Sequence, residues 1–305
     1  MAQKKIISVK AQTTELSRAP LLQDDLTLLY SNRSKRLRSL AKAHAMQDYL
    51  LFAADIVDSQ LSQLKKQPFQ PEQKQELMID WKTLPLLKTA YHRNSYWLFA
   101  LNAILDQLAA LPQYKTGPIA KTIKRIRAWK DNTKEKKATQ LLTGDFSAVG
   151  SDVAVFLWSA LSLYWAQLSR AHQLIAHEDI GVKRHICPIC GSEPVASVIL
   201  TGINNTAEGL RYLHCNLCES KWHYVRAICT NCENGGKIHY WTLDDKDSPI
   251  KTESCGDCQS HLKIFYQNKD TDLEPVADDL ASLALDALME EEGFPRSTIN
   301  PFLFP

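Results

Sequence analysis

The sequence predicts an α+β protein: an N-terminal all-α helical domain, then two tandem four-cysteine modules of the rubredoxin or zinc-ribbon type, then a C-terminal helix. Three observations lead to this fold class. All eight cysteines lie within residues 187–258, and all occur as C-x-x-C pairs. Apolar residues recur at the helical interval of three to four through the first part of the chain. After Gly181 the hydrophobic period changes to that of strands.

The four cysteine pairs predict two metal sites. Each C-x-x-C turn offers two thiolates, and two turns complete a tetrahedral four-sulfur site. Gaps of 24 residues between the first two pairs and 22 between the last two suit hairpins that return the chain to the metal. The first predicted site consists of Cys187, Cys190, Cys215 and Cys218, and the second of Cys229, Cys232, Cys255 and Cys258. An interleaved pairing stays open as an alternative.

The ligand set leaves the metal itself open. Four sulfurs suit zinc, and they also suit a single iron of the rubredoxin type. A catalytic zinc usually keeps one position open for water, which a four-sulfur shell does not offer. A disulfide framework is the main alternative, but nothing in the sequence indicates an oxidising compartment. His214 and His223 lie close to the pairs and could replace a cysteine, although packed or hydrogen-bonded histidines are more common.

Length and composition indicate a soluble globular protein of about two domains. Hydrophobic residues make up 45 % of the chain, and the net charge is only +2, so composition does not indicate a general polyanion binder. The first ten residues lack the apolar core of a signal peptide, and the longest apolar run, Val153–Ala166, is short for a membrane span of about 20 residues. We therefore expect a cytoplasmic protein with no membrane span.

The helical domain is predicted over residues 21–180, after a loosely ordered polar segment at 1–20. Its expected helices are a pair within 21–66, followed by 91–111, 119–130, 138–143 and 153–170. The last helix is apolar on nearly all sides and follows Ser151-Asp152 as its cap, so we expect it in the middle of a bundle. Leu84-Pro85-Leu86-Leu87 is predicted as a packed connection.

Two stretches of this domain are basic. The first helix carries Arg33, Lys35, Arg36 and Arg38, and residues 115–137 hold nine Lys or Arg. Such a run could meet nucleic acid or an acidic partner, but a solvated helix face is the more common meaning.

The two ribbons are predicted over residues 181–226 and 227–270. The expected strands are 195–200 and 210–214 in the first hairpin, 221–228 as the link, 238–243 and 250–253 in the second hairpin, and 262–266 at the end. Each ribbon alone has too little apolar surface for a stable core. A structural metal, with a binding free energy on the order of 10 kcal/mol, would supply the remainder.

Residues 271–305 are predicted as a C-terminal helix followed by an apolar tail that must dock. One helix over 275–292 presents apolar residues on one side and acidic residues on the other. The acidic set comprises Asp278, Asp279, Asp286, Glu290, Glu291 and Glu292. A solvated face is the common meaning of such a set, and the carboxylates could also receive a cationic segment of a partner.

Several runs of the sequence closely resemble the FdhE family of formate dehydrogenase accessory proteins. They include C-P-I-C-G-S-E-P at 187–194, G-L-R-Y-L-H-C-N-L-C at 209–218, C-T-N-C at 229–232, E-S-C-G-D-C at 253–258 and R-S-T-I-N-P-F-L-F-P at 296–305. The resemblance covers most of the chain and extends to every cysteine. It implies a cytoplasmic bacterial protein needed for active respiratory formate dehydrogenase, with rubredoxin-like metal centres. The family is expected to act on the catalytic subunit of that enzyme before twin-arginine export.

The residues themselves are compatible with an interaction protein. No dinucleotide-binding, P-loop or nucleophile-elbow motif occurs, so we expect no enzyme activity, no catalytic residues and no organic cofactor. A redox enzyme would need a spare cysteine pair or a redox-active iron, and no cysteine is spare. We expect the formate dehydrogenase catalytic subunit as the partner, bound across the junction between helical domain and ribbons, and self-association stays open.

The main alternative is a nucleic-acid-binding zinc-ribbon protein, which needs basic and aromatic residues together on the ribbons. The first ribbon and its link offer Lys221, Trp222, His223, Tyr224 and Arg226. The second ribbon opposes this interpretation with the acidic residues Asp244, Asp245, Asp247 and Glu253. Nucleic acid is therefore not the expected partner.

Overall fold

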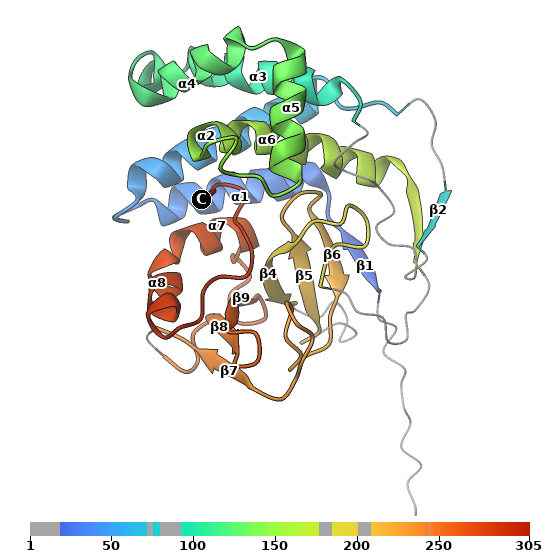
Figure 1. The fold of residues 1–305 in the computed structure, drawn as a ribbon, viewed down its shortest axis with the longest axis vertical. Coiled ribbons are helices and arrows are strands. Elements are labelled where there is room, and N and C mark those ends of the chain that lie inside the picture. The colour runs from blue at the N-terminus through green and yellow to red at the C-terminus, as the bar shows by residue number, and fades with distance from the viewer. Residues whose placement is uncertain (1–18, 72–75, 80–92, 177–184, 201–208, 244) are drawn as a thin grey trace, which may run out of the picture.

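The computed structural model describes residues 19–71, 76–79, 93–176, 185–200, 209–243 and 245–305. In Figure 1 the helices form a layer above a sheet, and the C-terminal helices lie beside the sheet under that layer. The predictions for residues 1–18, for Leu84–Leu87 and for the turn after residue 200 fall outside the described residues.

The helical layer is built around one buried helix. Its members are α1 (Leu26–Leu40), α2 (Gln47–Lys66), α3 (Tyr96–Ala110), a short 3-10 helix (Pro112–Tyr114), α4 (Gly117–Ala128), α5 (Asp131–Leu142) and α6 (Ser151–Ala171). Helix α6 is buried almost throughout, including the large side chains of Phe156 and Trp165, so its predicted place in the bundle centre is confirmed. Beside this layer, β2 (Glu76–Ile79) and β3 (Gln173–Ala176) form a separate parallel pair.

Three boundaries differ from the sequence-based expectation. The first helix begins at Leu26, because Asp25 accepts a hydrogen bond from the Leu28 N–H at 2.9 Å and so caps it. The fifth helix is longer than the predicted piece at 138–143. The predicted Ser151-Asp152 cap is wrong. Gly150 takes the cap position with φ +87°, and no side chain in the described part of the chain caps the first N–H groups of α6.

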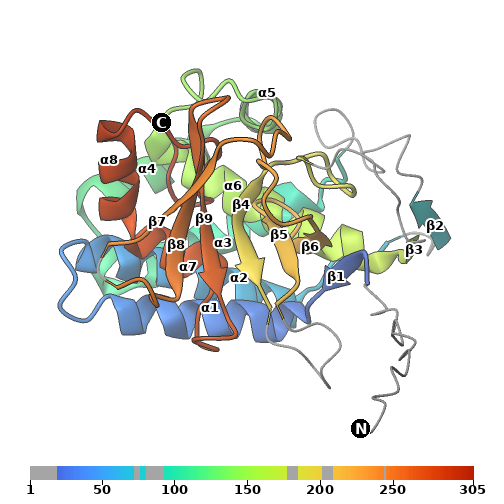
Figure 2. The same ribbon diagram turned by 90° about the horizontal axis from the view of Figure 1, so that it is seen from below.

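The sheet has seven strands and runs continuously through both cysteine modules. Its strands are β1 (Leu21–Gln23), β4 (Pro194–Ile199), β5 (Arg211–Cys215), β6 (Ser220–His223), β7 (Ile238–Trp241), β8 (Ile250–Cys255) and β9 (Ser260–Tyr266). Figure 2 shows their order, β7-β8-β9-β4-β5-β6-β1. All neighbours are antiparallel except β4 and β9, which pair in parallel over three residues, from Ser197↔Ile264 onward.

The two modules are repeats of one plan. Each consists of a cysteine turn, two antiparallel strands, a second cysteine turn and a third strand. The first strand of one module, β4, pairs with the third strand of the other, β9, so the modules join head to tail. A buried ion pair crosses this joint, where Arg211 Nη2 lies 3.0 Å from Glu253 Oε1. This fusion into one sheet was not predicted from the sequence.

The outer strand of the first module is covered by the N-terminal segment. Strand β1 pairs with β6, with Leu21 opposite Trp222, and the His223 N–H donates to the Pro20 carbonyl at 3.1 Å. At the other end of the sheet, β7 is the edge strand.

The C-terminal segment packs between the sheet and the helical layer. The single helix predicted over 275–292 is two helices, α7 (Pro275–Ala281) and α8 (Leu283–Glu291), which meet at Ser282. The apolar tail docks, as expected: the Phe304 ring lies 5.4 Å from that of Trp158 and 5.8 Å from that of Phe146. None of the helices in the described segments has both the length and the hydropathy of a membrane-spanning segment.

Candidate metal centres and the adjoining pocket

Each cysteine pair forms the same kind of turn. The residue after the second cysteine adopts a left-handed conformation in all four turns: Gly191 at φ +76°, Glu219 at +59°, Glu233 at +62° and Gln259 at +51°. In two of the turns its N–H donates to the carbonyl of the first cysteine, from Gly191 to Cys187 at 2.9 Å and from Glu233 to Cys229 at 3.1 Å. Only one of the four is glycine, so three turns hold a conformation that is unfavourable for a residue with a side chain.

The first cluster is formed by the turns before β4 and after β5. Cys187 Sγ lies 3.6 Å from Cys218 Sγ, and Cys190 Sγ lies 3.4 Å from Cys215 Sγ. The N–H groups of Leu217 and Cys218 both point at Cys215 Sγ, at 3.4 Å each. Backbone N–H groups aimed at sulfur stabilise a thiolate, the form that binds metal.

The second cluster repeats this arrangement one module later. Cys229 Sγ lies 3.6 Å from Cys258 Sγ, and Cys232 Sγ lies 3.6 Å from Cys255 Sγ. Cys229 Sγ accepts from the N–H groups of Asn231 at 3.3 Å and Cys232 at 3.5 Å. The eight cysteines therefore group in sequence order, four and four, and not in the interleaved manner.

The donor geometry fits a metal ion in each cluster. A tetrahedral ion with metal–sulfur bonds of about 2.3 Å holds its sulfurs about 3.8 Å apart, close to the separations of 3.4–3.6 Å seen here. The same distances exceed a disulfide bond of about 2.05 Å, and all eight cysteines are free, so the disulfide alternative is wrong. Burial raises the pKa of the Cys190 and Cys215 thiols. A bound cation would favour their thiolate forms.

Neither histidine near the turns joins a cluster. Within the described residues, the groups of cysteine, histidine and carboxylate that could hold a metal consist of cysteine alone. His214 instead forms a hydrogen bond from Nε2 to Glu219 Oε2 at 2.7 Å.

Glu219 begins a buried charge network that sequence reasoning missed. Arg33 of α1 donates to both Glu219 oxygens, at 2.6 and 2.7 Å, and through Nε to Glu274 at 3.0 Å. All three side chains are buried. Burial opposes ionisation of Glu219, yet Arg33 and His214 hold its pKa at about 2. The network ties the turn of the first cluster to α1 and to the start of α7.

The predicted acidic face of the C-terminal helix is largely wrong. Asp278, Asp279 and Asp286 are buried and ion-paired, and only the three glutamates after them are exposed. Asp278 pairs with Arg36 at 2.7 Å. The other two aspartates share the cations Lys263 and Arg296, with Asp279 2.6 Å from Arg296 and Asp286 2.5 Å from Lys263.

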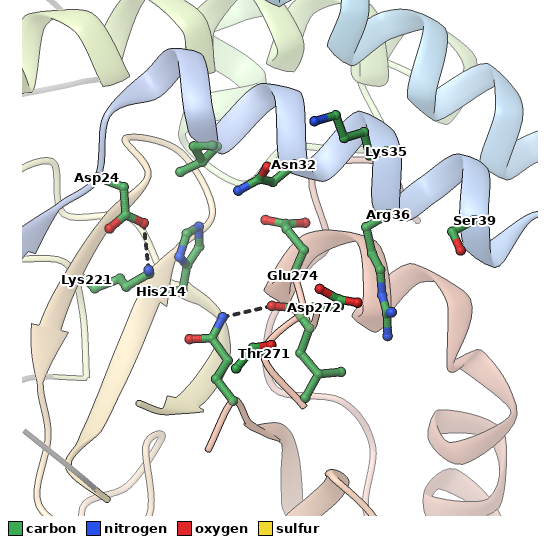
Figure 3. Close-up of a pocket in the computed structure, with 13 residues that line it drawn as sticks. Asp24, Asn32, Lys35, Arg36, Ser39, His214, Lys221, Thr271, Asp272 and Glu274 are labelled. Carbon is green, nitrogen blue, oxygen red and sulfur yellow. Dashed lines mark hydrogen bonds and ion pairs between the residues drawn. The ribbon is translucent and has the colours of Figure 1, made fainter. Parts of the chain in front are cut away.

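A pocket of about 370 Å³ lies where the helical layer, the first module and the C-terminal segment meet. Figure 3 shows α1 along one wall with Asn32, Lys35 and Ser39, strands with His214 and Lys221 along another, and the segment before α7 with Thr271 and Asp272. Lys221 forms an ion pair with Asp24 at 2.6 Å. The Nδ1 atom of His214 is buried in the pocket wall and has no hydrogen-bond partner among the described residues.

The candidate nucleic-acid residues do not form an exposed aromatic surface. Trp222 is fully buried, Lys221 is buried against Asp24, and Tyr224 is buried with its hydroxyl donating to the Cys229 carbonyl at 2.8 Å. Arg226 alone of the five is exposed, and His223 is half-buried. Part of the basic stretch 115–137 is neutralised within the chain, by pairs such as Arg125–Asp152 and Arg127–Asp106.

Three family models match successive parts of the chain. They are the FdhE N-terminal model at residues 18–182, the FdhE central domain at 186–226 and the FdhE C-terminal domain at 227–303. The chain belongs to the FdhE family.

Relatives with the same name match over most of their length. The FdhE homolog of Edwardsiella ictaluri is 46 % identical over 297 residues, covering 94 % of this chain and 92 % of the relative. Escherichia coli FdhE is 46 % identical over 289 residues, covering 94 % and 91 %. The crystal structure of the FdhE protein from Pseudomonas aeruginosa superposes with a TM-score of 0.78 at 30 % identity, covering 93 % of this chain and 98 % of the other.

Proposed function

We propose that this FdhE-family protein is an accessory protein for respiratory formate dehydrogenase, which binds the catalytic subunit in the cytoplasm before export. The observation that carries this proposal is the family membership over nearly the whole chain, including both cysteine modules. The role itself follows from the family resemblance of the sequence. The protein would act by binding and have no turnover of its own on formate.

The eight cysteines would hold two metal ions per chain, iron or zinc. The support is the geometry of two four-sulfur clusters whose separations suit tetrahedral coordination. An ion in either cluster would link two turns of one module. If the ion is iron, it could also carry one electron.

The client would bind at the junction pocket and not on the metals. Three separate parts of the fold supply its walls, so a partner seated there would contact all of them. Asn32 and Lys35 are exposed on α1 and line the pocket. Within the described residues, neither side chain forms an ion pair or a hydrogen bond. They are therefore free to meet a partner, in contrast with Arg33 and Arg36 on the same helix.

The test is a binding measurement with purified catalytic subunit, with and without its leader. Lys35→Glu should weaken binding at least tenfold, because it reverses a charge at the pocket mouth. Lys121→Glu makes the same change on α4, at the far side of the helical layer, and should leave the affinity unchanged. Equal affinities of both variants and the wild type would refute the pocket as the client site.

Two further results would decide the function. Capture of a molybdoenzyme subunit from anaerobically grown cells would support the accessory role, whereas recovery of nucleic acid alone would favour the zinc-ribbon alternative. Oxidation of formate by the purified protein, free of any molybdoenzyme, would contradict the expected absence of turnover.

A further inference from the structure

The two cysteine clusters differ in their access to solvent. In the first cluster all four cysteines are buried, none exposing more than 1 % of its surface. In the second, Cys229 and Cys255 are buried while Cys232 and Cys258 are half-buried. One cysteine from each turn of the second cluster is therefore partly exposed to solvent.

The cause lies in the residue before the second cysteine of each turn. In the first module this residue is Ile189 or Leu217, both fully buried in the hydrophobic core. In the second module it is Asn231 or Asp257, both exposed. The same position of the same turn is thus apolar around one cluster and polar around the other.

Hydrogen bonds also fasten the first cluster to the helical layer. Trp158 of α6 donates from Nε1 to the Asn216 carbonyl at 3.0 Å, within the turn that carries Cys215 and Cys218. Arg170, at the end of the same helix, donates to the Cys218 carbonyl at 3.0 Å. A reagent could reach this cluster only if the module and α6 separated.

Asn231 and Asp257 form a polar rim on the exposed side of the second cluster. The Asn231 amide lies 3.7 Å from Cys258 Sγ and 3.3 Å from Ser260 Oγ, and its own side chain is exposed. On the opposite turn Asp257 forms an ion pair with the exposed Lys237 at 3.4 Å. Moving a solvated amide or a surface ion pair aside costs little, about 0–1 kcal/mol for the pair.

We propose that the second cluster is the exchange site of the protein. This cluster gives up its metal ion to a chelating or thiol-rich partner and takes an ion back, while the first cluster retains its own ion. Release of a bound ion would begin at Cys258 Sγ and Cys232 Sγ, which incoming thiolates would replace, and would end with the replacement of Cys229 and Cys255. Each released cysteine takes up the proton that an incoming thiol has lost. No electron is transferred. The inference rests on the proposed metal sites.

The experiment uses the full chain loaded with zinc and challenged with excess 4-(2-pyridylazo)resorcinol, while helix content is followed by circular dichroism. Two zinc ions per chain should be released in two phases of one equivalent each. The first phase should be at least tenfold faster than the second and should proceed without loss of helix signal. Fewer than two ions per chain would overturn the metal sites and this inference together. Two ions released at one rate would overturn the inference alone.

Variants assign the phases. Cys258→Ser should abolish the fast equivalent and keep the slow one; loss of the slow one instead would overturn the assignment. Asn231→Leu keeps every ligand and covers the rim, and it should slow the fast phase several-fold. The matched control, Asn132→Leu, changes an exposed residue of α5, outside both cysteine clusters, and should leave both phases unchanged. Equal effects of the two leucine variants would contradict the role of the polar rim.

Discussion

Arg33 joins three segments that lie far apart in the sequence, because its guanidinium reaches both Glu219 and Glu274. The sequence marked it only as one of four basic residues on a helix. A closer signal exists: Arg33 lies four residues after Leu29 and four before Leu37, so it sits on the apolar face. A charge on such a face requires a buried partner, but the partner itself cannot be identified from helical spacing.

Glu219 should make stability depend on pH in acid. Its pKa is about 2 in the folded protein and rises to its ordinary value of about 4.5 on unfolding. Its contribution, about 3 kcal/mol for such a difference, is therefore complete above pH 4.5 and is lost as the pH falls toward 2. Urea unfolding should show the wild type more stable than Glu219→Gln at pH 6, with the gap closing between pH 4.5 and 3.

The matched control for this measurement is Glu291→Gln, which changes an exposed carboxylate and should shift stability by less than about 0.5 kcal/mol at any pH. Metal loss in acid affects all three proteins, so only their differences carry the result. A gap between wild type and Glu219→Gln that stays constant down to pH 3 would contradict the buried ion pair.

Among the elements, the regular ones could be predicted and the irregular ones could not. Helix α6 and the cysteine turns follow from hydrophobic period and C-x-x-C spacing, which are local properties of the chain. The break between α7 and α8 has no such local cause. Asp279 and Asp286 turn inward and form ion pairs with Lys263 and Arg296. Ion pairs between residues that lie apart in the sequence thus override the amphipathic pattern of a single helix.

The C-terminal tail should contribute measurably to stability. Phe304 packs against Trp158 and Phe146, so Phe304→Ala removes a buried ring and should cost about 3 kcal/mol in the free energy of unfolding. Leu303→Ala changes its neighbour, which is 36 % exposed, and should cost less than about 1 kcal/mol. Chemical denaturation of the two variants side by side checks the difference, and equal costs would show that the tail does not dock.

At the scale of the whole molecule, five strands of the two modules were predicted, whereas the expected link at 221–228 is the shorter strand β6 of the first module and the joint between the modules was not predicted. Strands β4 and β9 pair in parallel over only three residues, and β1 is equally short. A hydrophobic period of two residues identifies a strand and its buried face, but it does not specify which strands pair with each other in the sheet. The two four-cysteine groups, in contrast, followed from gap length, because a short loop limits how far the chain can travel before it returns.

Removal of β1 should make the protein self-associate. The Leu22→Pro substitution takes away the backbone N–H of the central residue of β1, which lies opposite Lys221 of β6. Freed β6 would present an unpaired edge that could accept β7, the exposed edge of a second copy. Sedimentation at increasing concentration should show larger particles for this variant. The control is Leu22→Ala, which keeps the backbone N–H and should behave as the wild type.

A head-to-tail joint does not by itself limit the number of units, because each added unit again presents a free edge of the kind that has just been paired. The β4–β9 contact is such a joint, and it leaves β6 and β7 as complementary ends of a series that could continue through other molecules. Strand β1 acts as a terminator at one end of that series. The three residues of β1 thus cover the edge of β6 at which a further β7 would otherwise extend the series.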